Sequence, residues 1–235
     1  MTVEEFSNEF DVLLNSAGYS KPLGLAQSPV ELDNYEKSIL LTEAQEALVK
    51  ELYNGGTTGE GFEVTEELRR ALDVLVTTYL PDKYAGSNLP TAITSNYSYF
   101  YELPTDILYI TYEQVTLKDD SLGCHNNTKA NVLPIRQDEI NVVLNNPFRG
   151  PSYRRVLRVD TGDSIIELIS KFKIGGYMIK YLRKPKPIIL ENLTNEQLSI
   201  DLEREEATCE LPNILHRPIL ERAVALAMRR VTSSK

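Results

Sequence analysis

The spacing of apolar residues changes along this chain, and that change most constrains the fold. Residues 1–85 carry apolar side chains three and four positions apart, which is typical of amphipathic helices. Residues 87–190 have short runs rich in Val, Ile, Thr and Tyr, which favour strands, and residues 191–235 return to helical spacing. Because helices and strands are grouped and do not alternate, the sequence predicts an α+β fold. We expect an N-terminal helical bundle, an antiparallel β-meander or hairpin region, and a C-terminal helix that packs back on the bundle.

Three helical regions are predicted in the first segment. The first covers residues 2–17, where Thr2 and Glu5 have the spacing of a capping box. The second covers residues 29–53, either as one helix or as two, and the third covers residues 65–79. The segments between them, 18–29 and 55–61, are rich in Gly, Ser or Thr and are predicted to be loops.

The middle of the chain predicts strands joined by long loops. Residues 107–117 are the clearest strand, and residues 132–135 are expected to return from a polar loop or hairpin tip at 119–131. Residues 87–101 are polar and aromatic without periodicity, which predicts a loop. Residues 136–145 are predicted to form a short helix.

Two glycines suggest how the last strands are arranged. Gly175 and Gly176 separate two β-rich runs, as in a two-residue hairpin turn, so residues 153–184 are predicted to form a three-stranded antiparallel meander. The closing helix is expected to begin near residue 216, because Pro218 suits a first helical turn better than a helix interior. We expect all 235 residues to form one domain.

Charge is distributed unevenly along the sequence. The net charge is −9, but residues 1–80 have 15 acids and 5 bases, whereas residues 149–186 have 10 bases and 3 acids. Such a chain can present surfaces of opposite sign, for contact between copies or for placing a basic surface near DNA phosphates. The candidate contact residues, called the basic strip below, are Arg154, Arg155, Arg158, Lys171, Lys173, Lys180, Arg183, Lys184 and Lys186.

Residues that carry out chemistry are few. The two cysteines and two histidines match a zinc site in number but not in spacing: Cys124, His125, Cys209 and His216. A nucleophile–base pair such as Cys124 with His216, or a serine with His125, stays open, although no nucleophile motif supports it. Neighbouring carboxylates, such as Asp119 and Asp120, are expected on solvated surfaces. The sequence therefore predicts no catalytic residue, metal or cofactor, and no enzyme activity.

The sequence also has no features of membrane insertion or export. No apolar run approaches the ~20 residues that span a bilayer, and the first residues are acidic, unlike a signal peptide. We therefore expect a soluble protein made in the cytoplasm.

Four segments carry a resemblance to a known class of protein: ELPTDILYI (102–110), VLPIRQDEINVVLNNPFRGP (132–151), IKYLRKPKPIIL (179–190) and CELPNILHRPILERAVALAM (209–228). Together they resemble crAss-like bacteriophage virion proteins of the head–tail connector and tail-ring class and, more distantly, the tail-tube adaptor proteins of short-tailed phages. The likeness covers about residues 102–230. The resemblance implies a ring subunit, commonly one of twelve, stacked below the portal or around the tail channel, and it implies no catalytic residues.

Two functions follow as hypotheses. In the first, the chain is a structural subunit of the head–tail connector or tail ring, in contact with its own copies, the portal and neighbouring ring proteins. DNA then passes through the channel of the virion without specific recognition. A head-to-tail ring needs two complementary patches on each chain, which an acidic half and the basic strip could supply. In the second, the chain is a DNA-associated virion protein that binds DNA non-specifically through the basic segment 149–186.

Overall fold

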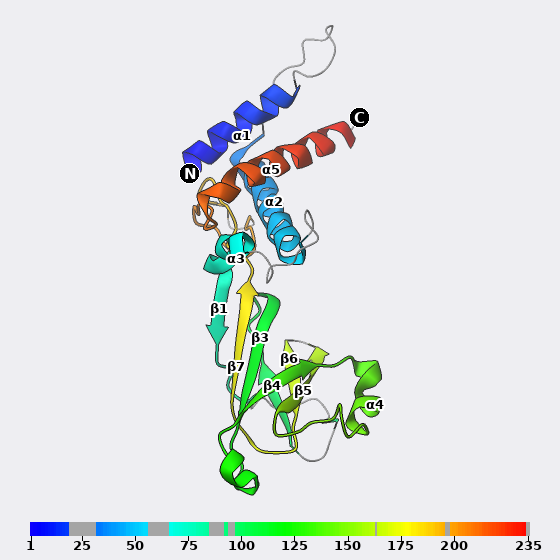
Figure 1. The fold of residues 1–235 in the computed structure, drawn as a ribbon. Helices are drawn as coiled ribbons and strands as arrows, with labels where there is room; N and C mark the ends of the chain where they lie inside the picture. The colour runs from blue at the N-terminus through cyan, green and yellow to red at the C-terminus, as the bar shows by residue number, and fades with distance from the viewer. Residues whose placement is uncertain are drawn as a thin grey trace. The chain divides into compact units, whose positions relative to one another are not determined.

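The chain separates into two compact units that are described one at a time. Unit 1 combines Met1–Leu75 with Lys184–Lys235, and unit 2 is Val76–Arg183 (Figure 1). The predicted loops at 18–29 and 55–61 lie almost wholly outside the described residues. The computed structural model describes residues 1–18, 32–55, 66–84, 92–93, 97–162, 164–195 and 198–233.

Unit 1 is built from helices, as the apolar spacing predicts. Helix α5 packs on both α1 and α2, which confirms the prediction of a closing C-terminal helix on the N-terminal helices (Figure 1). The core of this unit includes Phe6 and Phe10 of α1, Leu41 of α2 and Ile219 of α5, all fully buried. The helices are α1 (Val3–Gly18), α2 (Asn34–Asn54), α3 (Glu66–Leu72), the 3₁₀ turn η1 (Asp73–Leu75) and α5 (Asn213–Ser233).

Local capping sets the ends of the first two helices. The predicted capping box of α1 is present: the Glu5 N–H donates to Thr2 Oγ1 at 3.2 Å, and the Thr2 N–H donates to Glu5 Oε2 at 2.8 Å. Asp33 caps α2, and this helix continues unbroken until Gly55, whose φ of 69° ends it in the left-handed region. Residues 34–54 therefore form one helix.

A polar stripe on α2 binds the segment that returns from unit 2. The Leu190 N–H donates to Ser38 Oγ at 2.9 Å, and the Ile188 N–H donates to Thr42 Oγ1 at 3.1 Å. One turn further along, Gln45 Nε2 donates to the Lys186 carbonyl at 2.8 Å. Because these groups are buried or partly buried, their hydrogen bonds satisfy backbone groups that would otherwise lack water.

Unit 2 is a seven-stranded sheet in the order β1-β7-β3-β4-β5-β6-β2, of which β1, β7 and β3 are seen side by side in Figure 1. Every neighbouring pair is antiparallel except β4 and β5, which are parallel. The strands are β1 (Val76–Tyr79), β2 (Ser98–Glu102), β3 (Ile107–Leu117), β4 (Lys129–Pro134), β5 (Arg155–Gly162), β6 (Ile165–Ile169) and β7 (Ile174–Arg183). The short helices are η2 (Asp120–His125), η3 (Gln137–Glu139) and α4 (Ile140–Leu144).

The sheet carries a core on each face. On one face, Tyr177, Ile179 and Tyr181 of β7 are buried together, as their alternation in sequence predicts. On the other face, α4 covers β5 and β6, where Ile140 and Val143 pack with a second buried group. The short helix predicted within 136–145 is thus confirmed, and it lies on the crossover between the parallel strands β4 and β5.

Two predictions, one for the end of a helix and one for a loop, were wrong because strands distant in sequence determine the local structure. The predicted third helix ends early: residues 76–79 form β1, paired with β7, because Val-Thr-Thr-Tyr suits a strand once a partner is present. Part of the predicted loop 87–101 is also a strand, since residues 98–102 form β2 and pair with β6.

The predicted turn at Gly175 and Gly176 was wrong as well. Both glycines lie inside β7, which pairs with β1 and β3, so only β5 and β6 of the predicted meander are neighbours. A Cβ on Gly175 would lie 2.7 Å from Lys118 Cβ, so glycine here permits the close approach of the chain that directly follows β3. The closing helix also begins earlier than predicted, at Asn213, and includes Pro218 in its interior.

Candidate subunit-contact surface

The residues of the basic strip lie in both units, and some of them have internal partners whereas others are exposed. Seven of its nine residues belong to unit 2, whereas Lys184 and Lys186 belong to unit 1. Arg155, Arg158 and Lys184 have partners within their own unit, described below. The exposed members are Arg154, Lys171, Lys173, Lys180 and Lys186, and Arg183 is half-buried at the end of β7.

Arg158 is part of a buried polar cluster inside unit 2. Its Nη1 donates to Glu113 Oε2 at 2.6 Å, and the Tyr177 hydroxyl donates to Glu113 Oε1 at 2.5 Å. Only 11% of the Arg158 side chain and 6% of the Glu113 side chain are exposed. Burial, together with the Glu113 carboxylate, raises the pKa of Tyr177. Although burial alone would lower the pKa of Arg158, Glu113 outweighs it and raises that pKa, so Arg158 is an internal cation.

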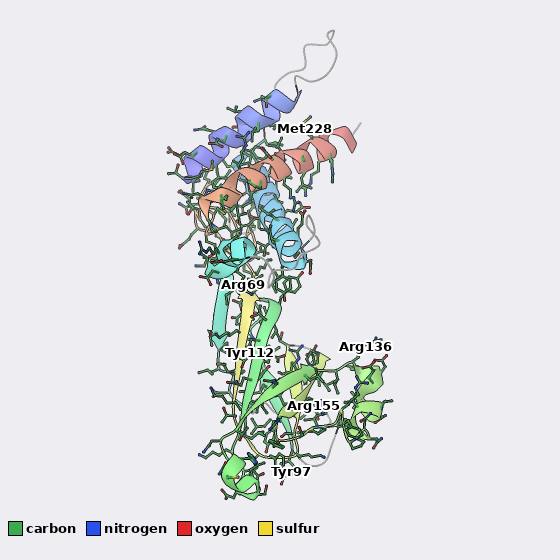
Figure 2. All side chains as sticks on the ribbon, in the orientation of Figure 1. Arg69, Tyr97, Tyr112, Arg136, Arg155 and Met228 are labelled. Carbon is green, nitrogen blue, oxygen red and sulfur yellow. The ribbon has the colours of Figure 1, made fainter. Side chains whose placement is uncertain are left out.

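Arg155 holds a loop that follows α4. Arg155, which Figure 2 labels, donates from its Nε to the Gly150 carbonyl at 3.1 Å and from its Nη2 to the Phe148 carbonyl. Within the loop, the Phe148 N–H donates to Asn146 Oδ1 at 2.9 Å, and the Gly150 N–H donates to the Asn146 carbonyl at 2.8 Å. Although its backbone is fixed in this way, the Phe148 side chain is 86% exposed. Nearby Val142 on α4 is 64% exposed.

Lys184 holds a turn in unit 1 that exposes a second large apolar side chain. Its Nζ donates to Asp201 Oδ1 and to Glu46 Oε1, each at 2.8 Å. Partial burial would lower the pKa of Lys184, but these two hydrogen bonds outweigh it and raise that pKa. Asp201 and Leu202 are the central residues of a two-residue turn, closed by backbone hydrogen bonds in both directions between Ile200 and Glu203.

The turn at Asp201 and Leu202 has an unusual backbone. Their φ angles are 51° and 70°, and turns with two left-handed residues normally use Asn-Gly or Asp-Gly. A leucine in this region costs about 1–2 kcal/mol. The Leu202 side chain is nevertheless 93% exposed, while Ile200 beside it is buried. The turn therefore combines backbone strain with an apolar side chain in water.

Three exposed cations of the basic strip, Arg154, Lys171 and Lys173, lie outside the strands of unit 2, whereas Lys180 lies on β7. Lys171 and Lys173 follow β6, and the Lys173 N–H donates to Asp119 Oδ2 at 3.0 Å. Hydrogen bonds from Ser121 and from Lys173 lower the pKa of Asp119 to about 2. The Arg154 guanidinium lies 5.1 Å from the centroid of the Tyr153 ring, which in turn stacks on the exposed ring of His125.

The two units differ in charge. Unit 1 has 23 acidic and 13 basic residues, a net −10, and unit 2 has 11 acidic and 12 basic residues, a net +1. The acidic half predicted from the sequence therefore corresponds to a separate compact unit. The acidic unit 1 and the exposed cations of the basic strip on unit 2 are available for contact between copies.

The cysteines and histidines are distributed over both units. Cys124 and His125 are exposed in unit 2, whereas Cys209 and His216 are buried in unit 1. Burial raises the pKa of Cys209 to about 11 and lowers that of His216, whose Nε2 lies 2.9 Å from the Leu211 carbonyl. Among the described residues, no group of three or more His, Cys, Asp or Glu side chains could hold a metal ion. No helix within these residues is sufficiently long and apolar to cross a membrane.

Sequence reasoning did not single out Phe148 and Leu202, two large apolar side chains that the structure exposes. Phe148 stands among turn-forming residues in Asn146-Pro147-Phe148-Arg149-Gly150, and a large aromatic side chain in such a turn could have indicated exposure. No local signal marks Leu202, because the turn that carries it is held through Asp201 by Lys184, which also binds Glu46 far away in sequence.

A fold with one strongly acidic unit, one nearly neutral unit and exposed apolar side chains on ordered turns is typical of a protein that works through contact with other proteins. Similarity to known proteins agrees with this class. The chain belongs to the phage tail ring protein 3/4 family of crAss-like phages, which it matches over residues 1–234. It is a structural ring subunit of a virion tail.

Two proteins of Bacteroides phage crAss001 are similar along nearly their whole lengths. Ring protein 3 is 44% identical over 230 residues, which cover 97% of this chain and 95% of the relative. Ring protein 4/5 is 32% identical over 234 residues, which cover 97% of this chain and 92% of the relative.

Proposed function

We propose that this chain forms a closed ring around the DNA channel in the portal–tail region of the virion, with about twelve copies. Membership of a tail ring family along the whole chain carries the proposal. The difference in charge between the units supports a head-to-tail arrangement, because each copy then meets its two neighbours through different surfaces. The portal and the rings above and below are the further partners.

In this proposal, DNA passes through the ring without sequence-specific recognition. Arg158 and Lys184, two of the predicted contact cations, are engaged by carboxylates within their own units, which reduces the positive charge available to phosphates. The exposed cations Arg154, Lys171 and Lys173 support the second hypothesis, in which unit 2 binds DNA non-specifically.

The first experiment measures the mass of the assembled protein. Twelve copies of a 26.6 kDa chain have a mass of about 320 kDa, which light scattering on a sizing column and negative-stain images distinguish from a monomer or dimer. The chain is studied alone, over a range of concentrations, and in isolated tails. A closed ring in either preparation supports the proposal, and the absence of a ring from both contradicts it.

The second experiment separates assembly from DNA binding. Lys171→Gln, Lys173→Gln and Lys180→Gln are combined, because all three side chains are exposed. The ring hypothesis predicts that the triple variant assembles and that DNA retention at low salt changes little. A large loss of DNA retention with assembly intact would favour the DNA-associated function.

A further inference from the structure

We infer that Leu202 of one copy inserts into a hollow beside Phe148 on unit 2 of the next copy, forming the repeated contact of the ring. The inference rests on the proposed ring and names its contact. Each partner surface is ordered before it binds, and each exposes a large apolar side chain. Preorganised apolar anchors of this kind lose little conformational entropy on docking.

The turn that carries Leu202 has features that folding of unit 1 does not require. Its left-handed backbone disfavours leucine, and almost all of the leucine side chain is in water, so neither feature stabilises the isolated unit. Lys184 nevertheless fixes Asp201 at 2.8 Å, and the buried Ile200 anchors the turn from within. The structure thus holds a side chain outward that gains free energy only when another surface covers it.

The surface that receives it lies over α4. A shallow, mainly apolar hollow there is bordered by the exposed Val142 and Phe148, and Arg155 holds the Phe148 carbonyl in place. The hollow is lined by Asn141, Val142, Asn145, Asn146, Pro147 and Phe148.

Charge identifies a second copy of this chain as the occupant. Around Leu202, residues 201–206 contain four acids and one base, a net −3. Around the hollow, residues 136–155 contain four bases and two acids, a net +2. The apolar anchor therefore has an acidic border and the hollow a basic one, which is the complementarity that a heterologous contact requires.

Leu202→Gly tests the contact without damaging the fold. Glycine adopts the left-handed backbone readily, so we expect the melting temperature of the monomer to stay equal or rise while assembly is lost. Phe148→Ser is expected to prevent assembly from the opposite side. Ile214→Asp is the matched control, because Ile214 is an exposed apolar residue of unit 1 outside the contact, and it should assemble normally. Normal ring formation by Leu202→Gly, or an equal loss in Ile214→Asp, would overturn the contact.

Mixing two defective variants tests the direction of the contact. Leu202→Asp keeps an intact hollow, and Phe148→Asp keeps an intact anchor, so each alone is expected to be monomeric. Their mixture can form one correct contact for each pair and should give one-to-one heterodimers of twice the monomer mass, with no larger species. Heterodimers support the inference, and a mixture that stays monomeric overturns it.

A disulfide trap reads out the same contact in the assembled ring. In a Cys124→Ser background, chains with Leu202→Cys are mixed with chains with Val142→Cys and oxidised. A covalent dimer containing one chain of each kind is expected, whereas dimers of Leu202→Cys chains alone would overturn the contact. If these variants form normal rings but no cross-links, the proposed contact is wrong and the proposed ring function still holds. If neither the wild-type protein nor the isolated tails contain a ring of this chain, the proposed ring function is wrong.

Discussion

Replacing Arg158 with methionine should destabilise unit 2 more than any other single substitution in the basic strip. Glu113 is 6% exposed and has Arg158 as its ion-pair partner at 2.6 Å, so the substitution leaves a buried carboxylate with only the Tyr177 hydroxyl. Breaking a buried pair by removing one partner costs about 3–5 kcal/mol. The second pair of Arg158, with Asp160, adds little because 70% of the Asp160 side chain is exposed.

Urea unfolding followed by far-ultraviolet circular dichroism measures this cost. The matched control is Lys180→Met on the exposed side of β7, which should change the free energy of unfolding by less than about 0.5 kcal/mol. Combining Arg158→Met with Glu113→Leu and Tyr177→Phe should restore most of the loss, because no buried polar group then lacks a partner. A loss below about 1 kcal/mol for Arg158→Met, or no recovery in the triple variant, would refute this reasoning.

Two further predictions concern side-chain packing and thiol reactivity. Gly175→Ala should lower the free energy of unfolding by about 1–3 kcal/mol, because its Cβ would lie 2.7 Å from Lys118 Cβ. Gly176→Ala is the control, since a Cβ at that position meets open space. Equal effects of the two substitutions in urea unfolding would contradict this prediction. Cys124 is exposed and should be alkylated in the folded protein at pH 8. Cys209 should react only after unfolding, because burial raises its pKa to about 11. Two modifications of the native protein, measured by intact-mass analysis, would contradict this prediction.

The helices could be predicted because their signals are local. Capping residues and apolar spacing defined α1, and the apolar face of α5 indicated that it would pack on other helices. The end of α3 could not be predicted in this way. Residues 76–79 form a strand because β7, a hundred residues later in the chain, provides the partner.

The sheet order was beyond sequence reasoning for the same reason. Gly175 and Gly176 carry a valid turn signal, but that signal does not distinguish a turn from a close approach of β3 inside a strand. The parallel pairing of β4 with β5 depends on the crossover through α4, which a short helix in the sequence did not imply.

The charged residues show the same limit at the candidate site. The sequence identified a concentration of cations but not which of them have internal partners, because Arg158 meets Glu113 and Lys184 meets Glu46 only after folding. The two apolar side chains proposed as contact anchors, Phe148 and Leu202, carry no charge and so lay outside that pattern.

A cryo-electron microscopy map of the isolated tail, with this chain located in it, tests the central claim most directly. We predict a closed ring on the tail axis, with Leu202 of each copy against Phe148 of the next in one repeating direction. A position away from the axis would contradict the ring function. A ring on the axis whose copies meet through other surfaces would contradict the proposed contact.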